Sequence, residues 1–90
     1  MYYLYDNVSE KDFIWIKCDN PYEKRKVVQE FILKGYTSYL NDIDYDGLAH
    51  LIIDLKNKII LHCGPSMAYN LKKNGVKYKN GYEFIKRIIN

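Results

Sequence analysis

Apolar residues are grouped in short runs along the 90-residue chain, and the pattern within several runs predicts strands. Residues 12–18, DFIWIKC, are apolar at both odd and even positions, which is typical of an inner strand covered on both faces. Residues 50–64, HLIIDLKNKIILHCG, have two apolar halves around a polar centre and predict a β-hairpin. Shorter extended segments are expected at residues 1–6, as an edge strand, and at residues 36–40 and 76–81.

Residues 21–34 predict the main helix, because Pro21 suits a first turn and Gly35 suits the position just past a helix end. Asn20 or Asp19 can cap the first turn. The predicted buried stripe consists of Val27, Val28, Phe31 and Ile32, and the residues expected to face water are Glu23, Lys24, Lys26 and Glu30. Shorter helices are expected at residues 65–73 and 82–90.

These elements predict a single α+β domain over residues 1–90. An antiparallel sheet of three to five strands would pack its apolar face on the helix at residues 21–34, and a short C-terminal helix would follow. The composition, 48% hydrophobic and 28% charged, is that of an ordinary globular chain and excludes an intrinsically disordered one.

The loop length of the hairpin decides which of its side chains share a face, since residues directly opposite in an antiparallel pair point to the same side. A three-residue loop at residues 56–58 collects six apolar side chains on one face, and we therefore expect this register. The expected pairs are Leu55 with Ile59, Ile53 with Leu61, and Leu51 with Cys63.

In that register, His50, Asp54 and His62 lie together on the second face of the hairpin, with Ile52 and Ile60. Two imidazoles and a carboxylate could bind zinc or relay protons. A small hydrolase or metal protein is therefore one hypothesis, and a solvated polar face of the sheet is the alternative.

Charge and cysteine content narrow the class of protein. The formal net charge of +3 permits contact with nucleic acid without demanding it, and argues against an acidic mimic of DNA. The opening residues MYYLYDNVSE have neither the basic start nor the long apolar stretch of a secretory leader. We therefore expect a cytoplasmic protein with two free thiols, Cys18 and Cys63, and no membrane partner.

Cys63 follows an apolar run and precedes Gly64, the setting in which protein tyrosine phosphatases place their nucleophile. That chemistry needs an arginine six positions later to grip the phosphate, and residue 69 is Tyr69. Pro65 also removes one backbone N–H donor from the loop. We therefore expect Cys63 to be a packed core side chain and assign no catalytic residue here.

An acidic stretch, DIDYDG, resembles the first half of a calcium-binding loop. Its carboxylates at alternate positions are Asp42, Asp44 and Asp46, but the twelfth position, which should hold a bidentate glutamate, is Ile53. We expect a solvated acidic loop, assign no metal, and keep these three aspartates as a second candidate binding surface.

The C-terminal third interleaves basic and aromatic residues, a pattern that suits phosphates and stacked bases. Ten tyrosines exceed what a core of this size can hide, so some must reach the surface. We predict a contact face made of Tyr69, Lys72, Lys73, Lys77 and Tyr78, with no cofactor. The alternative is a solvated lysine-rich surface with the tyrosines tucked into the core.

Three segments resemble small α/β proteins of bacteriophages and mobile elements. They are Lys34-Gly35-Tyr36 after the main helix, residues 51–60 of the hairpin, and Tyr82-Glu83-Phe84 at the last helix. The resemblance implies an anti-defence inhibitor, such as one that acts on a CRISPR effector. It brings no catalytic residues with it.

Three functional hypotheses follow. The first is a non-enzymatic phage or mobile-element inhibitor that contacts a host protein or ribonucleoprotein complex in the host cytoplasm. The second is a nucleotide or nucleic-acid binding protein that uses the basic-tyrosine stretch. The third is the enzyme or metal protein built on His50, Asp54 and His62.

Overall fold

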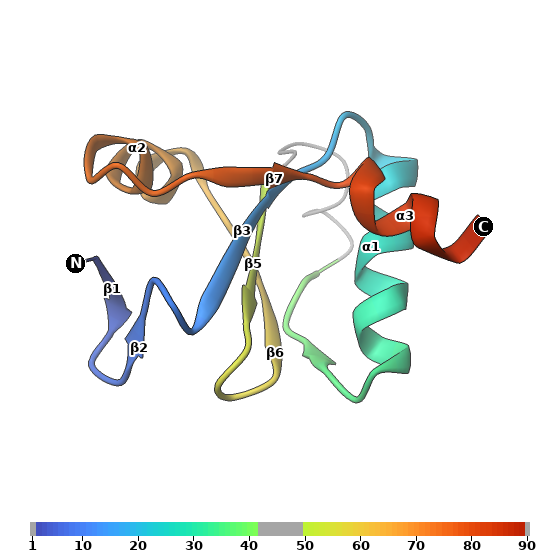
Figure 1. Ribbon diagram of the computed structural model, residues 1–90, viewed down its shortest axis with the longest axis horizontal. Coiled ribbons are helices and arrows are strands. Elements are labelled where there is room, and N and C mark those ends of the chain that lie inside the picture. The colour runs from blue at the N-terminus through green and yellow to red at the C-terminus, as the bar shows by residue number, and fades with distance from the viewer. Residues whose placement is uncertain (1, 42–49, 90) are drawn as a thin grey trace.

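The computed structural model describes residues 2–41 and 50–89, which form a five-stranded sheet, a separate two-stranded sheet and three helices (Figure 1). The strand order in the larger sheet is β4-β6-β5-β3-β7. In chain order the elements are β1 (Tyr3–Tyr5), β2 (Val8–Ser9), β3 (Phe13–Lys17), α1 (Pro21–Leu33), β4 (Thr37–Ser38), β5 (His50–Asp54), β6 (Ile59–His62), α2 (Pro65–Lys73), β7 (Tyr78–Asn80) and α3 (Tyr82–Ile89). The α+β class is confirmed.

The larger sheet is mixed, and the expectation of an antiparallel sheet was wrong. β5 pairs antiparallel with β3 and with β6, but β7 pairs parallel with β3, and β4 pairs parallel with β6. The reason is that α1 lies between β3 and β4, and α2 lies between β6 and β7. A helix that crosses over the sheet returns the chain to its starting edge, so the next strand runs in the same direction.

Both faces of the larger sheet are covered, each by its own apolar core. Figure 1 shows α1 and α3 on one side of the sheet and α2 with the β1–β2 hairpin on the other. The core under α1 contains Ile16, Cys18, Val27, Val28, Phe31, Leu51, Ile53 and Ile60. The core under α2 contains Val8, Phe13, Trp15, Ile52, Cys63 and Leu71. The expected inner strand, now β3, therefore contributes alternate residues to both cores.

The first run of the chain does not join the larger sheet, so the expected edge strand there was wrong. β1 pairs with β2 in the separate two-stranded sheet, with Tyr3 opposite Ser9 and Tyr5 opposite Val8. Val8 is fully buried in the core under α2. The hairpin thus serves as a cover for that core.

Helix α1 begins and ends as its sequence predicts. Asn20 caps it, since its Oδ1 accepts a hydrogen bond from the backbone N–H of Glu23 at 2.8 Å. Gly35 has φ +96°, the left-handed conformation that favours glycine after a helix.

The buried stripe of α1 differs from the predicted one. Ile32 is 47% exposed, whereas Glu23 and Lys24 are buried instead of facing water. Lys24, Val27, Val28 and Phe31 follow the i, i+3, i+4, i+7 spacing of one helix face, so the stripe begins one turn earlier and leaves Ile32 outside. The expected water-facing residues Lys26 and Glu30 are partly buried.

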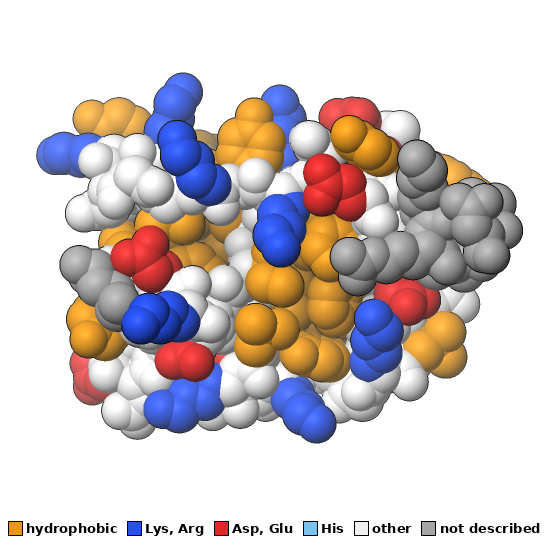
Figure 2. Space-filling model, in the orientation of Figure 1, with side chains coloured by type: hydrophobic (Ala, Val, Ile, Leu, Met, Phe, Trp, Pro, Cys, Tyr) orange, Lys and Arg blue, Asp and Glu red, His pale blue; other side chains and the backbone are white. Residues whose placement is uncertain are grey.

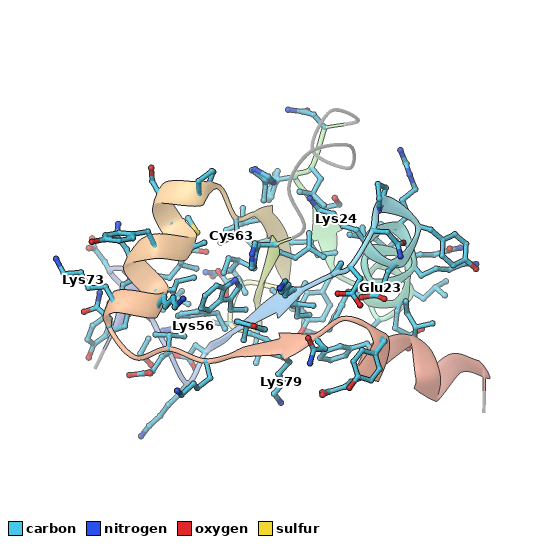
Figure 3. All side chains as sticks on the ribbon, turned by 90° about the horizontal axis from the view of Figure 1, so that it is seen from above. Glu23, Lys24, Lys56, Cys63, Lys73 and Lys79 are labelled. Atoms are coloured by element: carbon cyan, nitrogen blue, oxygen red, sulfur yellow. The ribbon has the colours of Figure 1, made fainter. Side chains whose placement is uncertain are left out.

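Gly81, between β7 and α3, lies close against the start of α1 and explains the burial of Glu23. The backbone N–H of Gly81 donates to the carbonyl of Lys17 at 2.7 Å. Figure 3 shows Glu23 beside this junction. A Cβ added at Gly81 would lie 2.8 Å from Oε1 of Glu23 and 2.9 Å from Sγ of Cys18.

The hairpin loop has four residues, 55–58, and the predicted three-residue loop was wrong. The observed pairs are Leu51 with His62, Ile52 with Leu61, Ile53 with Ile60, and Asp54 with Ile59. The turn is held by Asp54, whose Oδ1 accepts hydrogen bonds from the backbone N–H groups of Lys56 at 3.0 Å and Asn57 at 2.9 Å. Lys58 closes the turn at φ +56°.

We predict that Gly81→Ala lowers the free energy of unfolding by about 1–3 kcal/mol, because the added methyl group overpacks a junction between β7, α3 and α1. Gly64→Ala is the matched control, since the nearest atom to its added Cβ is 4.0 Å away. Its effect should stay within about 1 kcal/mol. Urea titrations of both variants measure the difference. Equal effects would show that the junction is loosely packed.

Candidate binding groove between α2 and β7

The enzyme hypothesis expects His50, Asp54 and His62 on one face of the hairpin, and this expectation was wrong. His50 and Asp54 lie on the face that α2 and the β1–β2 hairpin cover. His62 pairs with Leu51, whose side chain belongs to the core under α1, so His62 points to the opposite face. The one-residue change in hairpin register causes this separation, because it moves every side chain of β6 to the other side.

Asp54 has a structural role in which its carboxylate is saturated with hydrogen bonds. It is fully buried and accepts from the Tyr5 hydroxyl, from two backbone N–H groups of the turn, and from Nδ2 of Asn57 at 2.9 Å. Burial alone would raise the pKa of Asp54, but the hydrogen bonds from Tyr5, Asn57 and Lys56 outweigh it and hold the pKa below 3.8. Asp54 therefore fixes the turn and ties β1 to the sheet.

Both thiols are packed side chains. Burial raises the pKa of Cys63 to about 11 and that of Cys18 to about 12, so both are protonated near neutral pH. Figure 3 shows Cys63 where α2 meets the sheet. Within residues 2–41 and 50–89, no group of three metal-ligating side chains comes together. The acidic residues Asp42, Asp44 and Asp46 lie outside the described residues.

Four of the five residues of the predicted contact face come together in a groove between α2 and β7. Tyr69 and Lys72 come from α2, while Lys77 and Tyr78 come from the segment that leads into β7. Tyr69 is 66% exposed and Tyr78 is 46% exposed. Lys73 is also exposed, but it does not line the groove, and Figure 3 shows it at the outer side of α2.

Two adjoining hollows form the groove between α2 and β7, and a third hollow of about 480 Å³ continues from the second one past Gly75, Val76 and Lys77. The first hollow, about 330 Å³, is lined by Trp15, Lys17, His50, Pro65, Ala68, Tyr69, Lys72 and Tyr78. The second hollow, about 320 Å³, is lined by Trp15, Lys72, Gly75, Val76, Lys77 and Tyr78. They adjoin because three residues, Trp15, Lys72 and Tyr78, line both.

The groove has a rigid aromatic floor. Tyr78 lies opposite Trp15 in the parallel pairing of β7 with β3, and their ring centroids are 5.1 Å apart in an edge-to-face arrangement. Nε1 of Trp15 donates a hydrogen bond to Nδ1 of His50 at 2.9 Å. Nζ of Lys17 lies 5.6 Å from the centre of the Tyr78 ring.

His50 is neutral in this setting. Burial lowers its pKa below 6.5, and the positive charges of Lys17 and Lys24 lower it further. Because Nδ1 accepts from Trp15, the proton of the neutral ring resides on Nε2, which is then a hydrogen-bond donor.

The electrostatics of the groove favour an anion. Lys17, Lys72 and Lys77 line these two hollows, and no carboxylate is among the described residues that do so. Glu10 lines the third hollow, together with Lys11 and Lys79. Figure 2 shows basic side chains along the edge formed by α2 and β7, and below this edge a recess with apolar side chains and an acidic side chain at its rim. The pattern of the C-terminal third indicated the lysines and tyrosines, but Trp15, Lys17 and His50 carry no such signal, since only strand pairing brings them here.

Comparison of the chain with protein families, with curated proteins and with solved structures found no match. Of the helices in the described part of the chain, none has the length and apolar character needed to cross a membrane.

We predict that Tyr5→Phe lowers the free energy of unfolding by about 1–2 kcal/mol at pH 7, because it removes a hydrogen bond to a buried carboxylate. The folded-state pKa of Asp54 is depressed, so this stabilisation is present above about pH 4 and is lost as the pH falls through the lower folded-state pKa. The difference between wild type and Tyr5→Phe should therefore shrink toward pH 3 in urea titrations. Tyr3→Phe, at an exposed position of the same strand, is the control. A difference that is constant with pH would refute the role of the ionised carboxylate.

We also predict that neither Cys18 nor Cys63 reacts quickly with a thiol-specific disulfide reagent at pH 8 in the native protein. Both side chains have 0% exposure and raised pKa values, and the reagent needs an accessible thiolate. Two equivalents should react at once in guanidinium chloride. Rapid labelling of one thiol in the folded protein would reopen the hypothesis of a reactive Cys63.

Proposed function

We propose that this protein is a non-enzymatic binding protein that holds a segment of single-stranded nucleic acid in the groove between α2 and β7. The observation that carries the proposal is the composition of the groove. Two exposed rings, from Tyr69 and Tyr78, lie beside the buried ring of Trp15 and among three lysines, and no carboxylate lines these two hollows. Proteins that hold single strands combine positive charge along the backbone path with rings on which unpaired bases stack.

Single strands suit the groove better than duplexes do. The Tyr69 and Tyr78 rings line small hollows, where a base can stack on them only if it is unpaired and unstacked from its neighbours. A helix that reads duplex DNA presents several base-reading side chains to the major groove of the DNA. Helix α2 has nine residues, and Tyr69 and Lys72, which it contributes to the lining, do not form such a set. Tyr69 suits stacking on an unpaired base, and Lys72 suits contact with a phosphate.

The second candidate function is the one that the resemblance to bacteriophage and mobile-element proteins implies, an inhibitor of a host defence complex. A separate surface supports it. At the end of α1 and just after β4, Leu33 is 77% exposed and Tyr39 is 62% exposed. Exposed apolar and aromatic side chains are candidate anchors for a protein partner. Such a role would place the protein in the host cytoplasm, in contact with a host protein or ribonucleoprotein.

We predict that a twenty-nucleotide oligothymidine binds the protein and that its affinity falls with salt concentration, since each neutralised phosphate releases counterions. The double variant Lys72→Glu with Lys73→Glu should bind at least about tenfold more weakly at low salt and show a shallower salt dependence. Fluorescence anisotropy of a labelled strand measures both quantities. Both side chains are exposed, so the variant should keep the wild-type thermal transition.

Two controls decide between the candidate functions. Lys58→Glu changes the same charge at the turn between β5 and β6 and should leave strand binding within about threefold of wild type. If no oligonucleotide binds, the nucleic-acid proposal falls. Retention by wild type of a host protein from nuclease-treated lysate, and its loss in Leu33→Asp, would then favour the inhibitor.

A further inference from the structure

We infer that the two hollows hold two successive nucleotides of one strand, with Lys72 and Tyr78 at the step between them, and that the first hollow takes a base with a carbonyl oxygen where cytosine and adenine carry an amino group. This inference rests on the proposed function and goes beyond it. It states how many nucleotides the groove holds and which bases it prefers. Thymine and uracil have this oxygen at C4 and guanine has it at C6, whereas the O2 oxygen is common to all the pyrimidines.

The size and spacing of the hollows carry the first step. At about 330 and 320 Å³, each lies near the lower limit for small-molecule sites, so each suits one base with its sugar. Three residues belong to both hollows, so the two sites are neighbours with no intervening element. Two adjacent sites of similar volume can hold two adjacent nucleotides of one strand.

The shared residues fit the step between two nucleotides. Lys72 lines both hollows, so its flexible ammonium group can reach a phosphate that joins two nucleotides. Tyr78 also borders both, and nearly half of its surface is open to a base. Its contact with Trp15 restricts the ring, so little conformational freedom remains to be lost on binding.

The two hollows differ in their polar groups, and this difference predicts the base preference. The first hollow contains His50, whose Nδ1 is occupied by Trp15 so that Nε2–H is a donor, and Lys17, which has donors only. O4 of thymine or uracil and O6 of guanine can accept from these donors, whereas the amino group at the same position of cytosine or adenine cannot. The second hollow also has a lysine, Lys77, but it adds only Gly75 and Val76 beside it and has no histidine, so we expect a weaker base preference there.

Trp15 supplies a direct readout because it is the only tryptophan of the chain and lines both hollows. We expect a two-nucleotide oligothymidine with a 5′-phosphate to change its fluorescence, and to bind more tightly than thymidine monophosphate. A two-nucleotide oligocytidine should bind at least about threefold more weakly. Equal or tighter binding of the cytidine form would overturn the base preference.

Matched variants test the position of the step. Lys72→Glu should weaken binding of the two-nucleotide oligothymidine by about tenfold or more, whereas Lys73→Glu, the same change one residue along α2, should cost less than about threefold. Tyr78→Ala should cost about tenfold, and Tyr22→Ala, an exposed tyrosine on α1, should have no effect. Thermal melts show which variants are folded.

The outcomes separate this inference from the proposed function. If the twenty-nucleotide strand binds in a salt-dependent manner but Lys72→Glu and Lys73→Glu weaken it equally, the two-site inference is wrong and nucleic-acid binding stands. The same conclusion follows if saturating strand leaves Trp15 fluorescence unchanged. If neither the long nor the short strand binds, both proposals are wrong.

Discussion

The parallel pairing of β7 with β3 is the contact on which both the core and the groove depend. It places Tyr78 opposite Trp15 and, one step beyond the strand, brings the Gly81 N–H to within 2.7 Å of the Lys17 carbonyl. α3 starts directly after this bond and packs on α1, where the rings of Phe84 and Phe31 lie 5.7 Å apart. The same three-residue strand therefore closes one core and supplies the wall of the groove on the other face.

The two helical crossovers explain why the sheet is buried on both sides. The connection through α1 moves from β3 toward the β4 edge, and the connection through α2 moves from β6 toward the β7 edge. Parallel crossovers of one hand that move in opposite directions must lie on opposite faces. The polar residues His50 and Asp54 are consequently on a covered face, where each needs an internal partner. Trp15 and Tyr5 meet that need, so structural hydrogen bonds occupy the groups that suggested catalysis.

The sequence predicts the elements well because their signals are local: the Asn20 cap, Gly35 after α1, and the mixed parity of β3. What it does not predict depends on contacts between distant residues. The hairpin register follows from how the Asp54 side chain folds the turn, and burial of Lys24 follows from packing that no polarity pattern reveals. For the same reason, the sequence predicts only some of the residues that line the groove. Its tyrosines, Lys72 and Lys77 are close in sequence, whereas Lys17 and His50 reach it only through the pairing of β3 with β5 and β7.

The protein has a small net charge although the groove is basic, because carboxylates lie elsewhere in the fold. Asp54 fixes a turn, Glu23 accepts from the Asp19 backbone N–H at 3.1 Å, and Glu30 pairs with Lys34 at 3.5 Å. None of these three acids lines the two hollows between α2 and β7, and separation and screening weaken their attraction for the lysines there. The net charge of +3 therefore understates the field that a ligand meets in the groove. This surface suits an anionic strand because of how the charged side chains are distributed, and not because of the total charge of the protein.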